Sequence, residues 1–254
     1  MSTKSKIALV TGGSRGLGRD MIVNLAKNGN NIIFTYHSNK SEADKVVSEV
    51  LSLGQKAVAY PLDLGNIKTF DSFVQQVSEY LSEHAGSPNF DYLINNAGVG
   101  LYGSVTDTTE DVFDTLMNIH FKGVYFLTQK LLPLINDGGR IINISSGLTR
   151  FTFPNVSAYA SMKGAIETYT RSLAKELGSR QITANSIAPG AIATDFGGGS
   201  TKSDKNKRNA VASITALGRV GEPEDIGGVV AFLCTSEAGW VNAQRIELSG
   251  GMMV

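Results

Sequence analysis

A glycine-rich stretch near the N-terminus constrains the fold of this chain more than any other feature. Residues 7–10 form a short apolar run, residues 11–18 read Thr-Gly-Gly-Ser-Arg-Gly-Leu-Gly, and residues 19–28 are amphipathic. A strand, a glycine turn and a helix in this order make the first half of a βαβ nucleotide-binding unit. The glycines let the backbone approach a pyrophosphate, and the helix N-terminus offers it unpaired N–H groups. The pattern therefore predicts a bound dinucleotide; the alternative is a tight turn without a ligand.

Apolar strand-like runs alternate with longer amphipathic stretches along the rest of the chain. We expect strands at residues 7–10, 31–36, 57–61, 92–95, 140–145, 183–187 and 245–248, and helices at residues 16–28, 41–53, 67–83, 110–135, 158–178 and 223–234. This alternation predicts an α/β fold with a doubly wound parallel sheet (Rossmann fold) and helices on both faces. The 254 residues, 42% of them hydrophobic, suffice for one such core, so we expect a single domain over residues 1–254.

Charge and composition argue against several classes of function. The formal net charge is zero and no basic block stands out, so we expect neither a nucleic acid nor an acidic membrane as partner. Cys234 is the only cysteine, which leaves no intrachain disulfide and favours a reducing compartment. No segment approaches the roughly 20 apolar residues of a membrane span, and the first apolar run is too short for a signal peptide. With three scattered histidines, the chain is expected to be cytoplasmic and to hold no metal.

A tyrosine and a lysine four residues apart are the first candidates for catalysis. In a helix, Tyr159 and Lys163 would lie on one face. A tyrosine with its ordinary pKa near 10 exchanges protons poorly at neutral pH, and a neighbouring cation would pull the pKa of the phenol toward the working range. Ser146, thirteen residues before the tyrosine, could polarise a carbonyl oxygen. Alone, the pair is weak evidence for catalysis, because tyrosine and lysine at this spacing are more often found on a solvated helix face.

Five ordered motifs together resemble the short-chain dehydrogenase/reductase family. They are Thr11-Gly12-x3-Gly16-x-Gly18, Asn95-Asn96-Ala97-Gly98, Ser146, Tyr159-x3-Lys163 and Pro189-Gly190. The resemblance runs from residue 6 to residue 251 and implies hydride transfer from a nicotinamide cofactor to a carbonyl carbon. It also implies that Tyr159 donates the proton, that Ser146 holds the carbonyl oxygen, and that Lys163 lowers the pKa of the tyrosine and binds the nicotinamide ribose. The spacing to Tyr159 selects Ser146 over its neighbour Ser145.

The second expected strand indicates which nicotinamide cofactor is bound. An acidic residue at its end would favour NAD, whereas a basic residue would pair with the 2′-phosphate of NADP. Here no carboxylate follows until Glu42, and Arg15 lies in the glycine turn. In the family, this arrangement resembles NADP(H) binding, with Arg15, His37 and Ser38 as phosphate contacts.

The resemblance extends to the other cofactor contacts. It implies that Asp63 and Leu64 hold the adenine, and that the segment after residue 188 meets the nicotinamide carboxamide. The full expected set is Gly12, Ser14, Arg15, Gly16, Leu17, Gly18, His37, Ser38, Asp63, Leu64, Asn96, Ala97, Gly98, Tyr159, Lys163, Pro189, Gly190, Ile192 and Thr194.

One position departs from the family pattern. Relatives commonly have an asparagine three residues before the glycine of the central helix, where a kink holds a water that links the lysine to solvent. Counting back from Gly123 places His120 there, and Asn118 lies on another helical face. His120 is therefore a candidate member of a proton relay, because imidazole both donates and accepts; a packed core histidine is the alternative.

The substrate and the assembly are less constrained by sequence. The length and the Gly-Gly-Met ending are similar to 3-oxoacyl-(acyl-carrier-protein) reductases, but residues 135–139 lack the basic cluster that an acidic carrier should need, although Lys130 and Arg180 are available. We therefore expect a small or medium ketone or aldehyde as substrate; a regulatory NADP-binding protein is a third possibility. The glycine-rich stretch within residues 196–216 is a candidate substrate lid. Residues 240–248 and the long helices are expected to form a homodimer or homotetramer.

Overall fold

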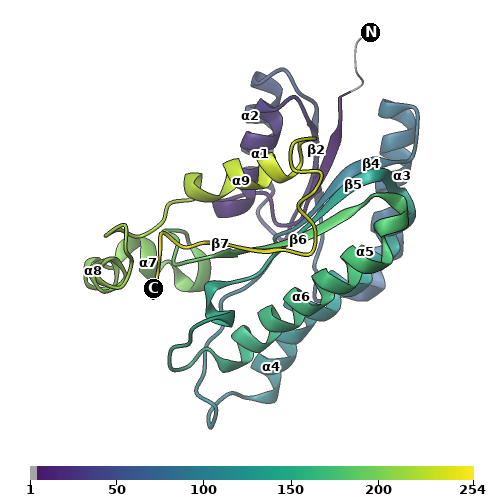
Figure 1. Ribbon diagram of the computed structural model, residues 1–254. Coiled ribbons are helices and arrows are strands. Elements are labelled where there is room, and N and C mark those ends of the chain that lie inside the picture. Colours follow the sequence, from purple (N-terminus) through teal and green to yellow (C-terminus); the bar gives the residue numbers. More distant parts are fainter. Residues whose placement is uncertain (1–4) are drawn as a thin grey trace.

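The structure is a computed structural model that describes residues 5–254 (Figure 1). One sheet of seven strands has the order β3-β2-β1-β4-β5-β6-β7, and every neighbouring pair is parallel. The strands are β1 (Ile7–Val10), β2 (Asn31–Tyr36), β3 (Ala57–Pro61), β4 (Phe90–Asn95), β5 (Ile135–Ile144), β6 (Thr183–Pro189) and β7 (Arg245–Leu248). The order reverses between β1 and β4, so the predicted doubly wound parallel sheet is confirmed.

Helices cover both faces of this sheet. The helices within residues 5–254 are α1 (Gly16–Lys27), α2 (Lys40–Ser52), α3 (Phe70–Ala85), α4 (Glu110–Met117), α5 (Gly123–Leu131), α6 (Ser157–Glu176), α7 (Ser200–Ser203), α8 (Lys205–Ser213) and α9 (Glu224–Leu233). Figure 1 shows α1, α2 and α9 on one face and α3, α5 and α6 on the other.

Strand β1 shows how the sequence builds two cores at once. All four of its residues are buried, but their side chains alternate between the faces of the sheet. Ala8 and Val10 join the core beneath α1, α2 and α9, whereas Ile7 and Leu9 join the core beneath α3, α5 and α6. A strand buried on both sides needs a continuous apolar run, which is the pattern of the sequence.

The central helix differs most from the sequence-based expectation. The helix expected over residues 110–135 is divided into α4, a π-helical turn η2 (Asn118–Lys122), α5 and the short turn η3 (Leu132–Leu134). After this π-helical turn, Gly123 lies so close to the loop after β3 that a Cβ on it would be 2.2 Å from the carbonyl oxygen of Leu64. Other expected helices end within a few residues of those observed. No helix within residues 5–254 is long and apolar enough to cross a membrane.

Candidate active site

A large cavity opens beyond the carboxyl ends of the strands. Its volume is about 950 Å³, and its position matches the ligand crevice of open α/β sheets. Every site residue expected from the sequence lines it. They are Gly12, Ser14, Arg15, Gly16, Leu17, Gly18, His37, Ser38, Asp63, Leu64, Asn96, Ala97, Gly98, His120, Ser146, Tyr159, Lys163, Pro189, Gly190, Ile192 and Thr194.

The glycine turn at the start of α1 has a geometry that side chains would destroy. Gly12 and Gly16 have φ values of +69° and +54°, in the left-handed region that favours glycine. A Cβ on Gly18 would lie 2.1 Å from the carbonyl oxygen of Gly12. The Asn96 amide donates to the carbonyl oxygens of Thr11 and Gly12, both at 3.0 Å, and so ties the turn to the end of β4. The result is a backbone cradle at a helix N-terminus, which fits a pyrophosphate.

The rim of the cavity near β2 is basic and polar. His37 and Ser38 follow directly after β2, and both line the cavity together with Arg15. Within residues 5–254, Arg15 forms no ion pair, whereas Arg19 one turn later is held by Glu49 at 2.9 Å. An unpaired guanidinium beside a nucleotide cradle fits a phosphate group on the adenosine ribose.

Helix α6 brings Tyr159 and Lys163 together in the lining of the cavity. Both side chains are buried, and Lys163 Nζ lies 5.6 Å from the centroid of the tyrosine ring. Lys163 Nζ donates to the carbonyl oxygen of Ile144 at 2.8 Å. Ser146 follows the end of β5 and caps the short turn η4 (Gly147–Thr149), where its Oγ accepts from the N–H of Leu148 at 3.2 Å.

Burial sets the protonation of this pair. It raises the pKa of Tyr159, with a smaller opposing effect from its hydrogen bond with Ser146. Burial also lowers the pKa of Lys163 to about 7. Desolvation of the phenolate is therefore the dominant influence on the pKa of Tyr159 in this structure. The expectation that Lys163 lowers the pKa of Tyr159 stays a prediction. Tyr159 is held neutral, which is the form that can donate a proton.

His120 lies in the π-helical turn and packs against the active-site tyrosine. Its Nε2 lies 2.7 Å from the carbonyl oxygen of Val99 and 3.2 Å from the N–H of the same residue. The shorter contact favours the tautomer in which Nε2 donates to the carbonyl, so that Nδ1 carries a lone pair. Nδ1 is buried and has no partner within residues 5–254. A Cβ on Gly98 would lie 2.5 Å from His120 Cε1, so the imidazole fills the space that the glycine leaves.

The imidazole of His120 is neutral at physiological pH. Burial is the main cause that lowers the pKa of His120 to about 3, and the nearby Lys163 charge lowers it further. The surroundings of the ring therefore move the pKa of His120 well below the value near 6.5 of an unperturbed histidine.

Sequence reasoning missed most of the aromatic outer wall of the cavity, of which only Phe196 belongs to the segment expected to form a lid. Tyr102 and Phe196 approach Tyr159 with ring centroids 6.3 and 6.0 Å away. Phe151 and Phe153 line the cavity from the loop after η4. Their place in the sequence could have identified them as cavity-lining residues. Tyr102 and the two phenylalanines follow the ends of β4 and β5, where ligands of open sheets bind.

The fold and the site define a nicotinamide-dependent oxidoreductase, because a dinucleotide cradle lies beside a buried proton donor. A family model described as Enoyl-(Acyl carrier protein) reductase matches residues 12–253. The chain is similar to Versicolorin reductase 1 of Dothistroma septosporum, with 34% identity over 97% of this chain and 95% of that protein. It is also similar to Tetrahydroxynaphthalene reductase PfmaG of Pestalotiopsis fici, with 35% identity over 97% and 91% of the two chains. The chain belongs to the short-chain dehydrogenase/reductase family.

Solved structures agree with this assignment. The angucycline C-6 ketoreductase LanV with bound NADP superimposes with a TM-score of 0.92 and 35% identity, covering 98% of this chain and 95% of the other. The reductase LugOII, described as catalysing keto-reduction at C1 during lugdunomycin biosynthesis, gives a TM-score of 0.93 and 36% identity over the full length of both chains.

Proposed function

We propose that this protein is an NADPH-dependent ketoreductase that reduces the carbonyl group of fused-ring aromatic ketones. The observation that carries the proposal is the neutral, buried Tyr159 at the base of a cavity whose outer wall is aromatic. Flat aromatic side chains favour offset or edge-to-face contact with a flat apolar substrate. The names of the relatives support this class, since they refer to versicolorin, tetrahydroxynaphthalene and angucycline substrates.

The residues have distinct roles in this reaction. NADPH, held by the glycine cradle and by Arg15, His37 and Ser38, supplies the hydride when it is bound. Tyr159 gives its proton to the carbonyl oxygen, and the Ser146 hydroxyl donates to that oxygen as negative charge develops. Lys163 stabilises the phenolate that remains and binds the nicotinamide ribose.

We assign His120 to the route by which the proton is replaced. Its unpartnered Nδ1 can accept a hydrogen bond from a water molecule, and its proximity to Lys163 supports a relay between the two side chains. Nε2 is anchored on Val99, so the ring has one end fixed and one end available.

A carrier-linked oxoester is less well supported as substrate. The two basic residues that sequence reasoning found for docking are engaged elsewhere: Lys130 binds Asp71 at 2.5 Å and Arg180 binds Asp137 at 2.7 Å. The relatives above are named for versicolorin and tetrahydroxynaphthalene, whereas the description of the family model refers to an acyl carrier protein.

Initial rates with NADPH on a carbonyl panel test the proposal. The panel contains 1-tetralone, 9,10-phenanthrenequinone, cyclohexanone and an acetoacetyl thioester of the acyl carrier protein. We expect kcat/KM for the aromatic compounds to exceed that for the thioester at least tenfold. A preference for the thioester would replace the proposal with the fatty-acid reaction, and no turnover of any carbonyl would refute it.

The segment over residues 196–216 is proposed as the substrate lid. It contains the turn η6 (Phe196–Gly198), α7 and α8, and its Phe196 faces Tyr159. Gly197 lies against the loop after β4, where a Cβ on Gly100 would meet Gly197 Cα at 2.6 Å. Three consecutive glycines with positive φ give this end of the lid a backbone that can change conformation at low cost.

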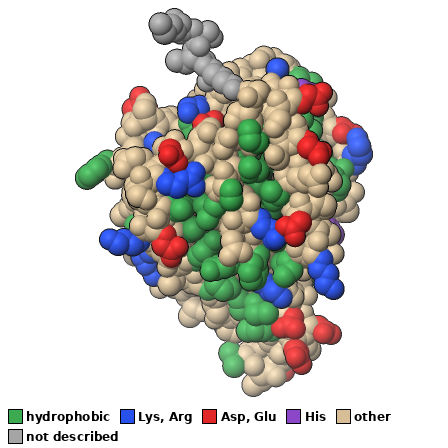
Figure 2. Space-filling model, turned by 90° about the vertical axis from the view of Figure 1, so that its right-hand side faces the viewer, with side chains coloured by type: hydrophobic (Ala, Val, Ile, Leu, Met, Phe, Trp, Pro, Cys, Tyr) green, Lys and Arg blue, Asp and Glu red, His purple; other side chains and the backbone are tan. Residues whose placement is uncertain are grey.

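A homodimer or homotetramer is proposed as the working assembly of this single catalytic domain. Figure 2 shows hydrophobic side chains gathered along the centre of the face at the right of Figure 1. On the helices, α4 and α5 expose Phe113 and Tyr125, and Trp240 before β7 is 98% exposed. Light scattering at micromolar concentration should give two or four chains, and Tyr125→Glu or Trp240→Glu should lower that number. A monomeric wild type contradicts this assembly.

The buried free thiol of Cys234 supports a cytoplasmic location.

A further inference from the structure

Helix α6 carries a third polar side chain in line with Tyr159 and Lys163. Glu167 follows the lysine by four residues, and only 12% of its side chain is exposed. A carboxylate buried to this extent requires hydrogen-bond partners. Its Oε1 accepts from Ser145 Oγ at 2.7 Å, from Thr149 Oγ1 at 2.7 Å and from Arg245 Nε at 2.8 Å.

The partners of Glu167 flank the active-site serine on both sides. Ser145 precedes Ser146, and Thr149 ends the turn that Ser146 begins. The Thr149 hydroxyl also lies 2.9 Å from the carbonyl oxygen of Ser146, and Arg245 Nη2 donates to the same oxygen at 3.3 Å. One carboxylate oxygen therefore fixes the whole turn against α6, the helix that carries Tyr159.

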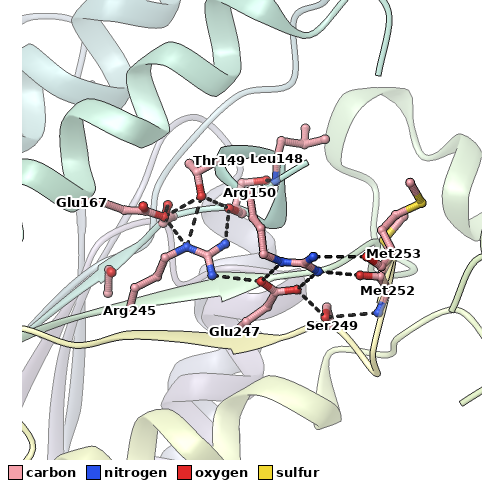
Figure 3. A network of polar contacts seen from close by, with 12 residues as sticks. Leu148, Thr149, Arg150, Glu167, Arg245, Glu247, Ser249, Met252 and Met253 are labelled. Atoms are coloured by element: carbon pink, nitrogen blue, oxygen red, sulfur yellow. Dashed lines mark hydrogen bonds and ion pairs between the residues drawn. The ribbon is translucent and has the colours of Figure 1, made fainter. Parts of the chain in front are cut away.

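Arg245 is held in turn by a second carboxylate (Figure 3). Its Nη1 donates to Glu247 at 2.9 Å, and Glu247 also binds Arg150 through two bonds of 2.8 and 2.7 Å. Arg150 donates to the carbonyl oxygens of Met252 and Met253 at 2.6 and 3.2 Å. Figure 3 shows this chain of contacts running from α6 across β7 to the C-terminal segment, where Met252 lines the cavity.

We propose that Glu167 and Arg245 are positioning residues that hold the Ser146 hydroxyl at the correct distance from the Tyr159 hydroxyl. Ser146 lies in a short turn, and such turns do not fix a side chain as firmly as a long helix does. Oxyanion donors act only when they are placed in advance, so a small displacement of the serine lowers the rate of the chemical step. The proposal rests on the proposed ketoreductase function.

The geometry of Glu167 permits an isosteric test. All three of its hydrogen bonds end on Oε1, and Oε2 has no hydrogen-bond partner within residues 5–254. Glu167→Gln keeps an oxygen at the first position and places its amide at the second, so it should retain kcat within about threefold. Glu167→Asp keeps the charge on a shorter stem, and Glu167→Ala removes the acceptor. Both should lower kcat by about ten- to a hundredfold and leave the KM for NADPH within about twofold of wild type.

The measurements are steady-state kcat and KM for NADPH with 9,10-phenanthrenequinone as substrate. Single-turnover oxidation of NADPH with enzyme in excess resolves the chemical step of slow variants. Glu49→Ala is the matched control, because it breaks an exposed two-bond pair with Arg19 on α1 and α2, and it should change neither constant. A loss of kcat in Glu167→Gln equal to that in Glu167→Ala would overturn the proposal, as would unchanged kcat in Glu167→Asp and Glu167→Ala.

A double-mutant cycle separates positioning from general stabilisation. If Glu167 acts through Ser146, adding Glu167→Asp to Ser146→Ala should cost less than about twofold in the hydride-transfer rate. A purely structural role would cost the same factor in both backgrounds and would overturn the proposal. The outcome is distinct from failure of the proposed function, in which the wild-type protein would reduce no carbonyl at all.

Discussion

His120 and Tyr159 meet edge to face, with ring centroids 5.1 Å apart and planes at 88°. The imidazole thus forms part of the wall around the proposed proton donor and is more than a distant relay member. Its neutral state matters, because a charged ring at this distance would alter the pKa of the tyrosine. The low pKa of His120 keeps the pair uncharged at physiological pH.

Replacement of His120 should affect the rate but not the neutral part of the pH profile. With a pKa of about 3, the ring does not change charge between about pH 5 and 8, so wild type and His120→Asn should give superimposable pH–rate profiles there. We expect kcat of His120→Asn within about tenfold of wild type and a larger loss in His120→Ala, because alanine holds no water. An acidic limb near pH 6.5 in the wild type alone would show that the ring is more hydrated than the structure indicates.

Removal of the phenol should separate chemistry from cofactor binding. Tyr159→Phe keeps the ring that packs against His120 but removes the proton donor, so carbonyl reduction should fall at least about a hundredfold. NADPH affinity, measured by fluorescence titration, should stay within about threefold. Turnover above one tenth of the wild-type rate would end the assignment of Tyr159 as donor.

Cofactor preference should depend on Arg15. The guanidinium has no ion-pair partner within residues 5–254, so it is available to a 2′-phosphate. Loss of a charge-assisted hydrogen bond costs about 1.5–3 kcal/mol, so Arg15→Ala should reduce the preference for NADPH over NADH by roughly ten- to a hundredfold. Arg19→Ala is the control, because Arg19 is paired with Glu49. A wild-type enzyme that uses NADH as well as NADPH would contradict the role of Arg15.

The buried lysine makes stability depend on pH in a defined window. The folded pKa of Lys163 is about 7, while an unfolded lysine titrates near 10.4, so between these values the unfolded chain binds a proton that the folded chain lacks. The free energy of unfolding therefore rises with pH in this window, by up to about 1.4 kcal/mol per pH unit from this group. The raised pKa of Tyr159 acts only above about pH 10.

Urea unfolding of wild type and Lys163→Met at about pH 7, 8 and 9 isolates this effect. The wild type should gain stability relative to the methionine variant with each step. Parallel curves would show that Lys163 stays protonated in the folded protein.

The fold was largely predictable because its signals are local. Alternating apolar runs and amphipathic stretches mark the seven strands, and the glycine turn marks where the first strand ends. The π-helical turn at Asn118–Lys122 was not predictable as such from periodicity, because the close approach of Gly123 to the carbonyl oxygen of Leu64 joins residues that are far apart in the sequence.

In the candidate site, too, the residues with a local sequence pattern could be predicted, and the contacts between distant residues could not. Tyr159, Lys163 and the glycine cradle have fixed spacings, so the sequence could identify them and the structure places them around one cavity. Glu167 and Arg245 are 78 residues apart, and no local pattern connects them. The protonation of the Tyr159 and Lys163 pair also required the structure, because burial, and not their spacing, decides both pKa values.

The contact between Gly98 and His120 has a consequence for how the active site can change over time. Because a methyl group at residue 98 would overlap the imidazole, Gly98→Ala should be tolerated only after His120 has become a smaller residue such as asparagine. In the reverse order, the intermediate carries a methyl group that overlaps the imidazole, so the ring or its neighbours must shift. The order of the two substitutions is therefore constrained. A lineage that carries histidine at position 120 must keep glycine at position 98 until the histidine is replaced.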